Sequence, residues 1–144
     1  MQKDYLGPAA EARKAGKAAI KEGRHDDAWG YFHDQKSLYM QQANRSEFTA
    51  LQVLALDSTV HVDLANILRL EKRDHEALAH ILYVVIAQGA RASKQDEQKL
   101  ATYFKRCKLQ NTDIADVKKF ASSKIAYPDF LSAQSKAKEW IGRG

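Results

Sequence analysis

The chain has 144 residues, of which 44% are hydrophobic and 28% charged, and it contains only seven Gly and two Pro. These values are typical of one globular domain, and so few helix breakers favour helices over a many-turned β fold. No stretch approaches the roughly 20 apolar residues that a membrane span needs, and the N-terminus lacks the apolar core of a signal peptide. The sequence therefore predicts a single all-α domain, residues 1–144, that is soluble and cytoplasmic and binds no membrane.

Charge is unevenly spread along the chain. The formal net charge is +5, and residues 1–90 carry 11 Lys or Arg against 12 Asp or Glu, whereas residues 91–144 carry 12 against 6. This basic C-terminal helical segment permits an acidic partner or nucleic acid, although a similar excess is ordinary for solvated helices. Cys107 is the only cysteine, which excludes an intrachain disulfide and a zinc site made of cysteines.

The first two predicted helices meet at the corner KEGRHDDAWGYF. Pro8 suits a first helical turn and Gly23 suits the left-handed position after a helix end, so the first helix is expected over residues 8–22. The acidic pair Asp26 and Asp27 favours the N-terminal end of the second helix, where it complements the helix dipole. That helix is expected to run to about residue 43.

The third helix is expected over residues 46–70, with Ser46 as its cap. The segment STVHVDL inside it also fits a short strand by alternation, but no turn residue interrupts the helical pattern and no partner strand is apparent. Arg73 and Asp74 open a fourth helix that ends near Gly89. This is the most apolar segment of the chain, and we expect it to be the most buried.

Three more helices are predicted in the last third of the chain. Ser93 and Asp96 have the spacing of a reciprocal capping pattern at a helix start. Thr112 or Asp113 can cap a sixth helix, and the turn Tyr-Pro-Asp that ends at Asp129 begins a seventh. About seven helices joined by short loops are therefore expected.

One helical corner occurs twice, since KEGRHDDAWGYF aligns with LEKRDHEALAHI 49 residues later. The repeat resembles the tetratricopeptide repeat family, which has a small residue on its first helix, another twelve residues later, and a large apolar residue four beyond that. In the first hairpin the matching residues are Gly16, Ala28 and Phe32. In the second hairpin they are Ala65, Ala77 and Ile81. The resemblance implies two stacked hairpins over residues 8–90, with each pair of helices crossing most closely at its small residues.

The resemblance also implies a non-catalytic protein- or peptide-binding adaptor that uses the concave face of the hairpin array. The groove positions carried over to this sequence are Arg13, Lys14, Lys17, Asp63, Asn66 and Arg69. Such basic groups and an amide can hold a peptide carboxylate or acidic side chains. Lys17 and Asp63 stand where carboxylate-binding members have asparagine, so a generic peptide groove is expected. Self-association is a further expectation, through exposed aromatic residues such as Trp29, Tyr31 and Trp140.

The histidines and the cysteine predict no metal, cofactor or nucleophile site. His75 and His80 are five residues apart, so on a helix they diverge by about 140° and do not share a face. His61 lies on an apolar face and is expected to be a core histidine with polar partners. Cys107 lies on the apolar side of its helix, and the sequence shows no neighbour that would activate it.

An alternative function comes from Arg69 and His75, whose arrangement resembles the motif of HEPN ribonucleases. In that family Arg stabilises phosphate charge and His acts as acid or base, which implies a helical RNA-binding or RNA-cleaving domain. The motif is short, so the non-catalytic adaptor is preferred. The basic residues that would contact nucleic acid are Lys105, Arg106, Lys108, Lys118, Lys119 and Lys124.

Overall fold

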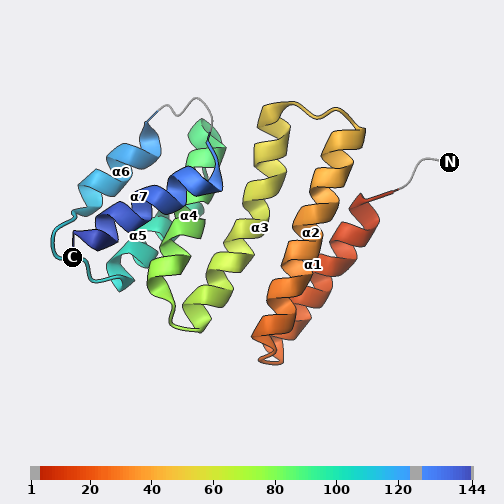
Figure 1. The fold of residues 1–144 in the computed structure, drawn as a ribbon, viewed down its shortest axis with the longest axis horizontal. Helices are drawn as coiled ribbons and strands as arrows, with labels where there is room; N and C mark the ends of the chain where they lie inside the picture. Colours follow the sequence, from red (N-terminus) through yellow and green to blue (C-terminus); the bar gives the residue numbers. More distant parts are fainter. Residues whose placement is uncertain (1–3, 124–127, 144) are drawn as a thin grey trace. The chain divides into compact units, whose positions relative to one another are not determined.

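The computed structural model describes residues 4–123 and 128–143, and this part of the chain is all-helical (Figure 1). The helices are α1 (Leu6–Lys21), α2 (His25–Arg45), α3 (Ala50–Leu70), α4 (Asp74–Gln88), the short 3-10 turn η1 (Gly89–Arg91), α5 (Lys94–Arg106), α6 (Ile114–Ser122) and α7 (Phe130–Gly142). The predicted all-α fold class is confirmed, and so are the seven α-helices. The segment STVHVDL lies inside α3, so its preferred interpretation as helix is confirmed and the strand alternative is wrong. Within the described residues, no helix combines the length and apolar character that crossing a bilayer requires.

The chain divides into two compact units, which we call unit 1 (Met1–Ile67) and unit 2 (Leu68–Gly144). Unit 1 contains α1, α2 and most of α3, whereas unit 2 contains α4 to α7. The division falls within α3 and not near residue 90, where the repeat pattern ends. The single domain over residues 1–144 stays a prediction.

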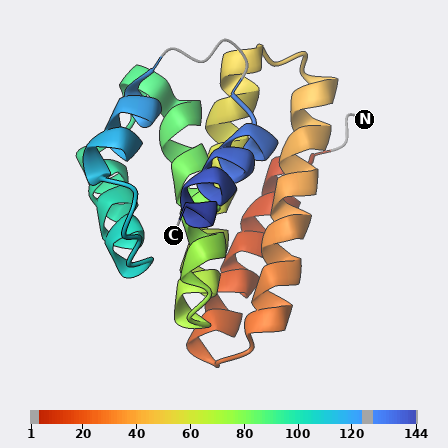
Figure 2. The same cartoon turned by 60° about the vertical axis from the view of Figure 1, so that its left-hand side comes forward.

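Unit 1 consists of three helices around one apolar core. α1 and α2 lie side by side and antiparallel, joined by the tight corner at Gly23 (Figures 1 and 2). Each helix contributes small or branched side chains that are fully buried, as expected where helices pack closely. The core residues are Ala19 from α1, Ala28 and Phe32 from α2, and Val60, Leu64 and Ile67 from α3.

Gly16 is the point where α1 comes closest to Phe32 of α2. A Cβ atom built on Gly16 would lie 2.8 Å from the Phe32 ring, which is too close for a carbon contact. Ala28 lies one helical turn before Phe32 and is fully buried. The predicted set of Gly16, Ala28 and Phe32 therefore lies at the packed core of the first hairpin. Its counterparts Ala65 and Ala77 are both buried, but they belong to different units and their crossing stays a prediction.

We expect Gly16→Ala to lower the free energy of unfolding by about 1–3 kcal/mol, because the added methyl group overpacks the contact with Phe32. Gly30→Ala is the matched control. Gly30 lies inside α2 and is exposed, and a Cβ built there meets no atom within 4 Å, so this change should raise stability by about 0.5–1 kcal/mol. Urea unfolding followed by circular dichroism measures both. Effects of the same sign would contradict the close approach of α1 to Phe32.

Most helix ends follow the predicted signals. Gly23 has a φ of 75° just after α1, as a glycine at this position allows. Asp113 accepts a hydrogen bond from the backbone N–H of Ala115, and with Asp116 it completes a capping box at the start of α6. Asp129 accepts from the N–H of Ser132 at 2.7 Å and begins α7. These local signals depend only on neighbouring residues, which explains why the sequence identifies them.

Ser46 is the exception, because it ends α2 and does not cap α3. Its hydroxyl oxygen accepts a hydrogen bond from Gln42 at 2.7 Å. Thr49 caps α3 in its place: its Oγ1 accepts from the N–H of Gln52 at 3.2 Å, and Gln52 Oε1 accepts from the N–H of Thr49 at 2.8 Å. The predicted helix start at residue 46 is wrong, although the Thr-x-x-Gln spacing of a capping box is visible in the sequence.

α4 is the central helix of unit 2. Every residue from Ala77 to Ala87 is buried, and α5, α6 and α7 all contact this helix. α7 crosses α4 in both ribbon views (Figures 1 and 2). A helix that is apolar on all sides suits such a central position, and the prediction that residues 74–89 are the most buried segment is confirmed.

Trp140 on α7 belongs to the core of unit 2. It is 1% exposed, and its ring meets the Phe120 ring edge to face with centroids 5.8 Å apart. The expectation that Trp140 is an exposed aromatic for self-association is wrong, because the apolar side of α7 turns it inward. Trp29 and Tyr31 of unit 1 are half-buried.

Candidate functional site

Lys17 on α1 and Asp63 on α3 form an ion pair across unit 1. Lys17 Nζ lies 3.1 Å from Asp63 Oδ1, although the two residues are 46 positions apart in the sequence. The Asp63 side chain is 13% exposed and the Lys17 side chain is 46% exposed, so a nearly buried carboxylate is neutralised from the solvent side. The structure thus brings together two of the residues predicted to line a peptide groove.

Three more predicted residues lie next to this ion pair in unit 1. Arg13 and Lys14 precede Lys17 by one turn of α1, and both are exposed; neither forms an ion pair within the described residues. Asn66 follows Asp63 by three positions on α3, so it is on a neighbouring part of the same helix surface. We call the surface formed by these five residues, Arg13, Lys14, Lys17, Asp63 and Asn66, the α1–α3 face.

Arg69, the sixth predicted groove residue, belongs to unit 2. It lies in the last turn of α3, and its side chain hydrogen-bonds Tyr103 of α5. Burial raises the pKa of Tyr103, and Arg69 opposes part of that rise. The structure therefore gives Arg69 a partner in unit 2, whereas the other five groove residues all lie in unit 1.

Unit 1 contains a polar cluster between α2 and α3 that the sequence does not predict. Lys36 Nζ on α2 lies 2.6 Å from Asp57 Oδ1 and 2.8 Å from His61 Nε2 on α3. Asp57 and His61 are buried, so each needs a polar partner. His61 is thus a core histidine with polar partners, as expected. The i, i+4 spacing of Asp57 and His61 marks a shared face of α3, but no local pattern points to Lys36.

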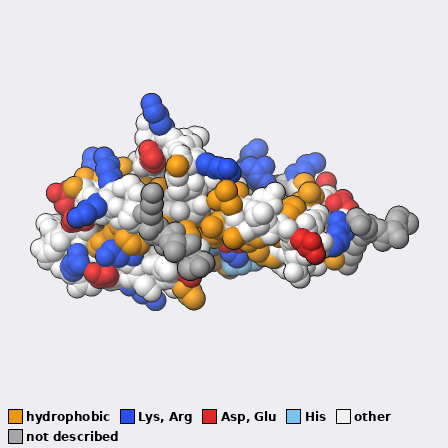
Figure 3. Space-filling view, turned by 90° about the horizontal axis from the view of Figure 1, so that it is seen from above, with side chains coloured by type: hydrophobic (Ala, Val, Ile, Leu, Met, Phe, Trp, Pro, Cys, Tyr) orange, Lys and Arg blue, Asp and Glu red, His pale blue; other side chains and the backbone are white. Residues whose placement is uncertain are grey.

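The residues of the nucleic-acid alternative are distributed over unit 2. Arg106 on α5 pairs with Asp74 at the start of α4, with Nε 3.1 Å from Oδ1. The other described members, Lys105, Lys108, Lys118 and Lys119, are exposed, whereas Lys124 lies outside the described residues. On the face seen in Figure 3, Lys and Arg side chains are scattered and acidic side chains lie among them. A nucleic-acid surface concentrates positive charge along one stripe, and this face shows no such stripe.

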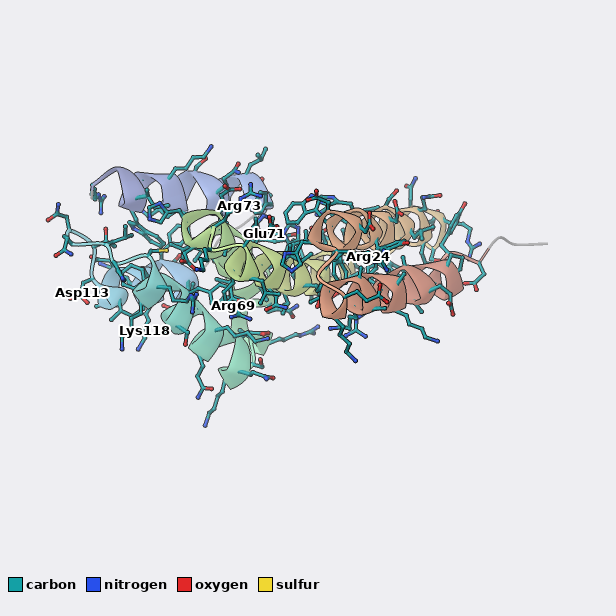
Figure 4. All side chains as sticks on the ribbon, turned by 90° about the horizontal axis from the view of Figure 1, so that it is seen from below. Arg24, Arg69, Glu71, Arg73, Asp113 and Lys118 are labelled. Carbon is teal, nitrogen blue, oxygen red and sulfur yellow. The ribbon has the colours of Figure 1, made fainter. Side chains whose placement is uncertain are left out.

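His75 is exposed in the first turn of α4, beside a shallow pocket of about 280 Å³. The residues that line this pocket are Lys72, Arg73, Asp74, His75, Glu76 and Arg106. Arg73 forms an ion pair with Glu76, and Arg69 is not in this lining. Figure 4 shows Arg69 and Arg73 near the turn between α3 and α4. The pocket therefore does not combine His75 with the arginine that the ribonuclease motif requires.

Cys107 is buried at the end of α5. Its Sγ lies 3.4 Å from the carbonyl oxygens of Asp74 and Tyr103, to which the thiol can donate. Burial raises the pKa of the Cys107 thiol to about 11, and the negative charge of Asp74 adds to the rise. A thiol with this pKa is almost entirely protonated at neutral pH, so it is a poor nucleophile. Over residues 4–123 and 128–143, no group of three or more His, Cys, Asp or Glu side chains is arranged to hold a metal ion.

Comparisons with known proteins gave no relative: no protein-family model, no curated protein and no solved structure matches the chain. The helical architecture is compatible with a repeat-like fold.

Proposed function

We propose that the protein is a non-catalytic adaptor that binds an acidic peptide or protein segment on the α1–α3 face of unit 1. The ion pair between Lys17 and Asp63 is the observation that supports this most strongly. It joins α1 to α3, the two helices that stacked tetratricopeptide-like hairpins would place along one concave face. In this proposal α1 to α4 form such an array.

The charge of the α1–α3 face favours an acidic ligand. The face carries three cationic side chains, Arg13, Lys14 and Lys17, and one carboxylate, that of Asp63. Asp63 is already neutralised by Lys17, so Arg13 and Lys14 are left to pair with a ligand. Charge-assisted hydrogen bonds from guanidinium and ammonium groups to carboxylates are stronger than neutral ones. Because these side chains are exposed, the interaction should weaken as salt is added.

The nucleic-acid or ribonuclease alternative has less support. Arg69 is engaged with Tyr103, and Arg106 is engaged with Asp74. Arg69 does not line the pocket that His75 lines; Arg106 does line it, but its guanidinium is paired there with Asp74. The lysines of this alternative that the structure describes, Lys105, Lys108, Lys118 and Lys119, are absent from the lining of that pocket.

Fluorescence anisotropy with a fluorescein-labelled decapeptide of alternating Glu and Gly tests the proposal. We expect the double variant R13E/K14E to lower the affinity about tenfold or more at low salt, because two attractive charges become repulsive. The matched control is K105E/K108E, which makes the same charge change on α5 and in the loop after it, in unit 2. This control should leave the affinity of the peptide unchanged.

Two results would contradict the proposal. An equal loss of affinity in both double variants would show that net charge alone attracts the peptide. Binding of a labelled oligouridylate that is abolished by K105E/K108E and unaffected by R13E/K14E would support the nucleic-acid function in place of the adaptor.

A further inference from the structure

A second candidate site lies entirely in unit 2, at the C-terminal end of α4. It is a mostly apolar pocket of about 750 Å³, a size in the range of sites that hold small molecules. Val85 and Ile86 of α4 and Leu100 of α5 are buried and line it. Ala101 of α5 and Ile114 of α6 continue this apolar lining. Because every lining residue belongs to unit 2, this pocket is separate from the α1–α3 face.

The fixed polar groups around the pocket are hydrogen-bond acceptors. Ser122 donates its hydroxyl hydrogen to the carbonyl oxygen of Lys119 at 3.2 Å, and Ser123 donates to that of Phe120 at 2.6 Å. Both hydroxyl oxygens therefore keep only lone pairs for a ligand. The pocket also lies at the C-terminal ends of α4 and α6, where helix carbonyl groups carry partial negative charge.

Two charged side chains complete the lining. Glu97 in the first turn of α5 and Lys118 on α6 are both exposed, and neither forms an ion pair with a described residue. Lys118, labelled on α6 in Figure 4, has a long flexible stem that can carry its ammonium group into water. The Glu97 side chain is shorter, so its carboxylate stays closer to the pocket that it lines. The formal charges of Glu97 and Lys118 cancel, so the serine oxygens and the C-terminal ends of α4 and α6 are what favour a positive group in the pocket.

We propose that this pocket binds a small organic cation, namely a primary amine with an aromatic or aliphatic body. The apolar body contacts Val85, Ile86 and Leu100, and the ammonium group donates to the Glu97 carboxylate and to the serine oxygens at the rim. An ammonium group has three donors and no acceptor, which matches the acceptor-rich rim. A carboxylate in the same position would meet Glu97 and two helix C-termini, with Lys118 as its only attractive charge.

Titration of the ¹⁵N-labelled protein with 4-phenylbutylamine and with 4-phenylbutyrate, followed by NMR, tests the proposal, because the two probes share one body and differ in charge. The amine should saturate shifts of the Gly89, Ala90 and Ser122 amides and bind about tenfold more tightly than the acid. E97Q should weaken amine binding about threefold. K118M should tighten amine binding, because it removes a like charge from the lining. K138M, on the exposed side of α7 and outside the lining, is the control and should leave amine binding unchanged. An unchanged spectrum outside the pocket verifies that each variant is folded.

Three outcomes would overturn the proposal. Tighter binding of 4-phenylbutyrate that is lost in K118M would make the pocket an anion site. Equal binding of both probes would leave an apolar pocket without charge selectivity. Absence of any saturable shift at these amides up to about 10 mM, the weak end of ligand binding, would show that the pocket takes neither molecule.

Discussion

Replacing Phe32 by alanine is expected to lower the free energy of unfolding by about 3–5 kcal/mol. Phe32 is fully buried and belongs to the core shared by α1, α2 and α3 of unit 1. Its ring also fills the space that Gly16 leaves open, since a Cβ on Gly16 would lie 2.8 Å from it. Alanine at position 32 therefore removes contacts with more than one helix and leaves a cavity.

Urea unfolding followed by circular dichroism measures this loss. His33→Ala is the matched control on the same helix, because His33 is exposed, and a surface change of this kind should alter stability by no more than about 0.5 kcal/mol. A loss below about 1 kcal/mol for Phe32→Ala would contradict the core position of the ring.

The contact between Gly16 and Phe32 also predicts a coupling between the two positions. In a Phe32→Leu background the ring that crowds position 16 is absent. Gly16→Ala should therefore lower the free energy of unfolding by less than it does in the wild-type chain. A double-mutant cycle gives the interaction energy directly. Additive effects would show that the two side chains do not meet.

Replacing Trp140 by alanine is expected to lower the free energy of unfolding by about 3–5 kcal/mol. Trp140 is 1% exposed and packs edge to face against Phe120. The Lys136 ammonium lies 5.8 Å from the centroid of the Trp140 ring, within cation–π range. Loss of the indole therefore removes its contacts with the Phe120 ring and the Lys136 ammonium group, and it leaves a large cavity in unit 2.

Trp29→Ala is a control of the same residue type, because Trp29 is only half-buried on α2 of unit 1. It should lower the free energy of unfolding clearly less than Trp140→Ala does in the same urea experiment, since this loss scales with the buried apolar area that the substitution removes. Trp140→Phe keeps an aromatic ring at the site and should recover part of the lost stability. Equal losses for the two alanine variants would contradict the burial difference between the tryptophans.

The two proposed sites would give the chain separate binding surfaces in its two units. The α1–α3 face offers exposed cations to an acidic segment, whereas the unit 2 pocket offers an apolar floor and acceptors to an amine. Glu97→Gln and the double variant R13E/K14E each alter only one of these surfaces. Either proposal can therefore fail without affecting the other.

The sequence by itself determined the helices and most of their ends. Gly23, Asp113 and Asp129 act on backbone groups within three residues, so their effect does not depend on the rest of the fold. The burial of α4 was equally predictable, because a helix with apolar side chains on every side has no polar face to expose to solvent.

Only the tertiary structure decided which side chains meet. Lys17 reaches Asp63 and Lys36 reaches Asp57 because three helices pack around one core, and no local pattern relates residues so far apart. Likewise, an apolar stripe on α7 does not reveal that Phe120 will cover Trp140. Helix formation depends on neighbours along the chain, whereas a binding surface depends on how helices pack, and packing is set by the whole core.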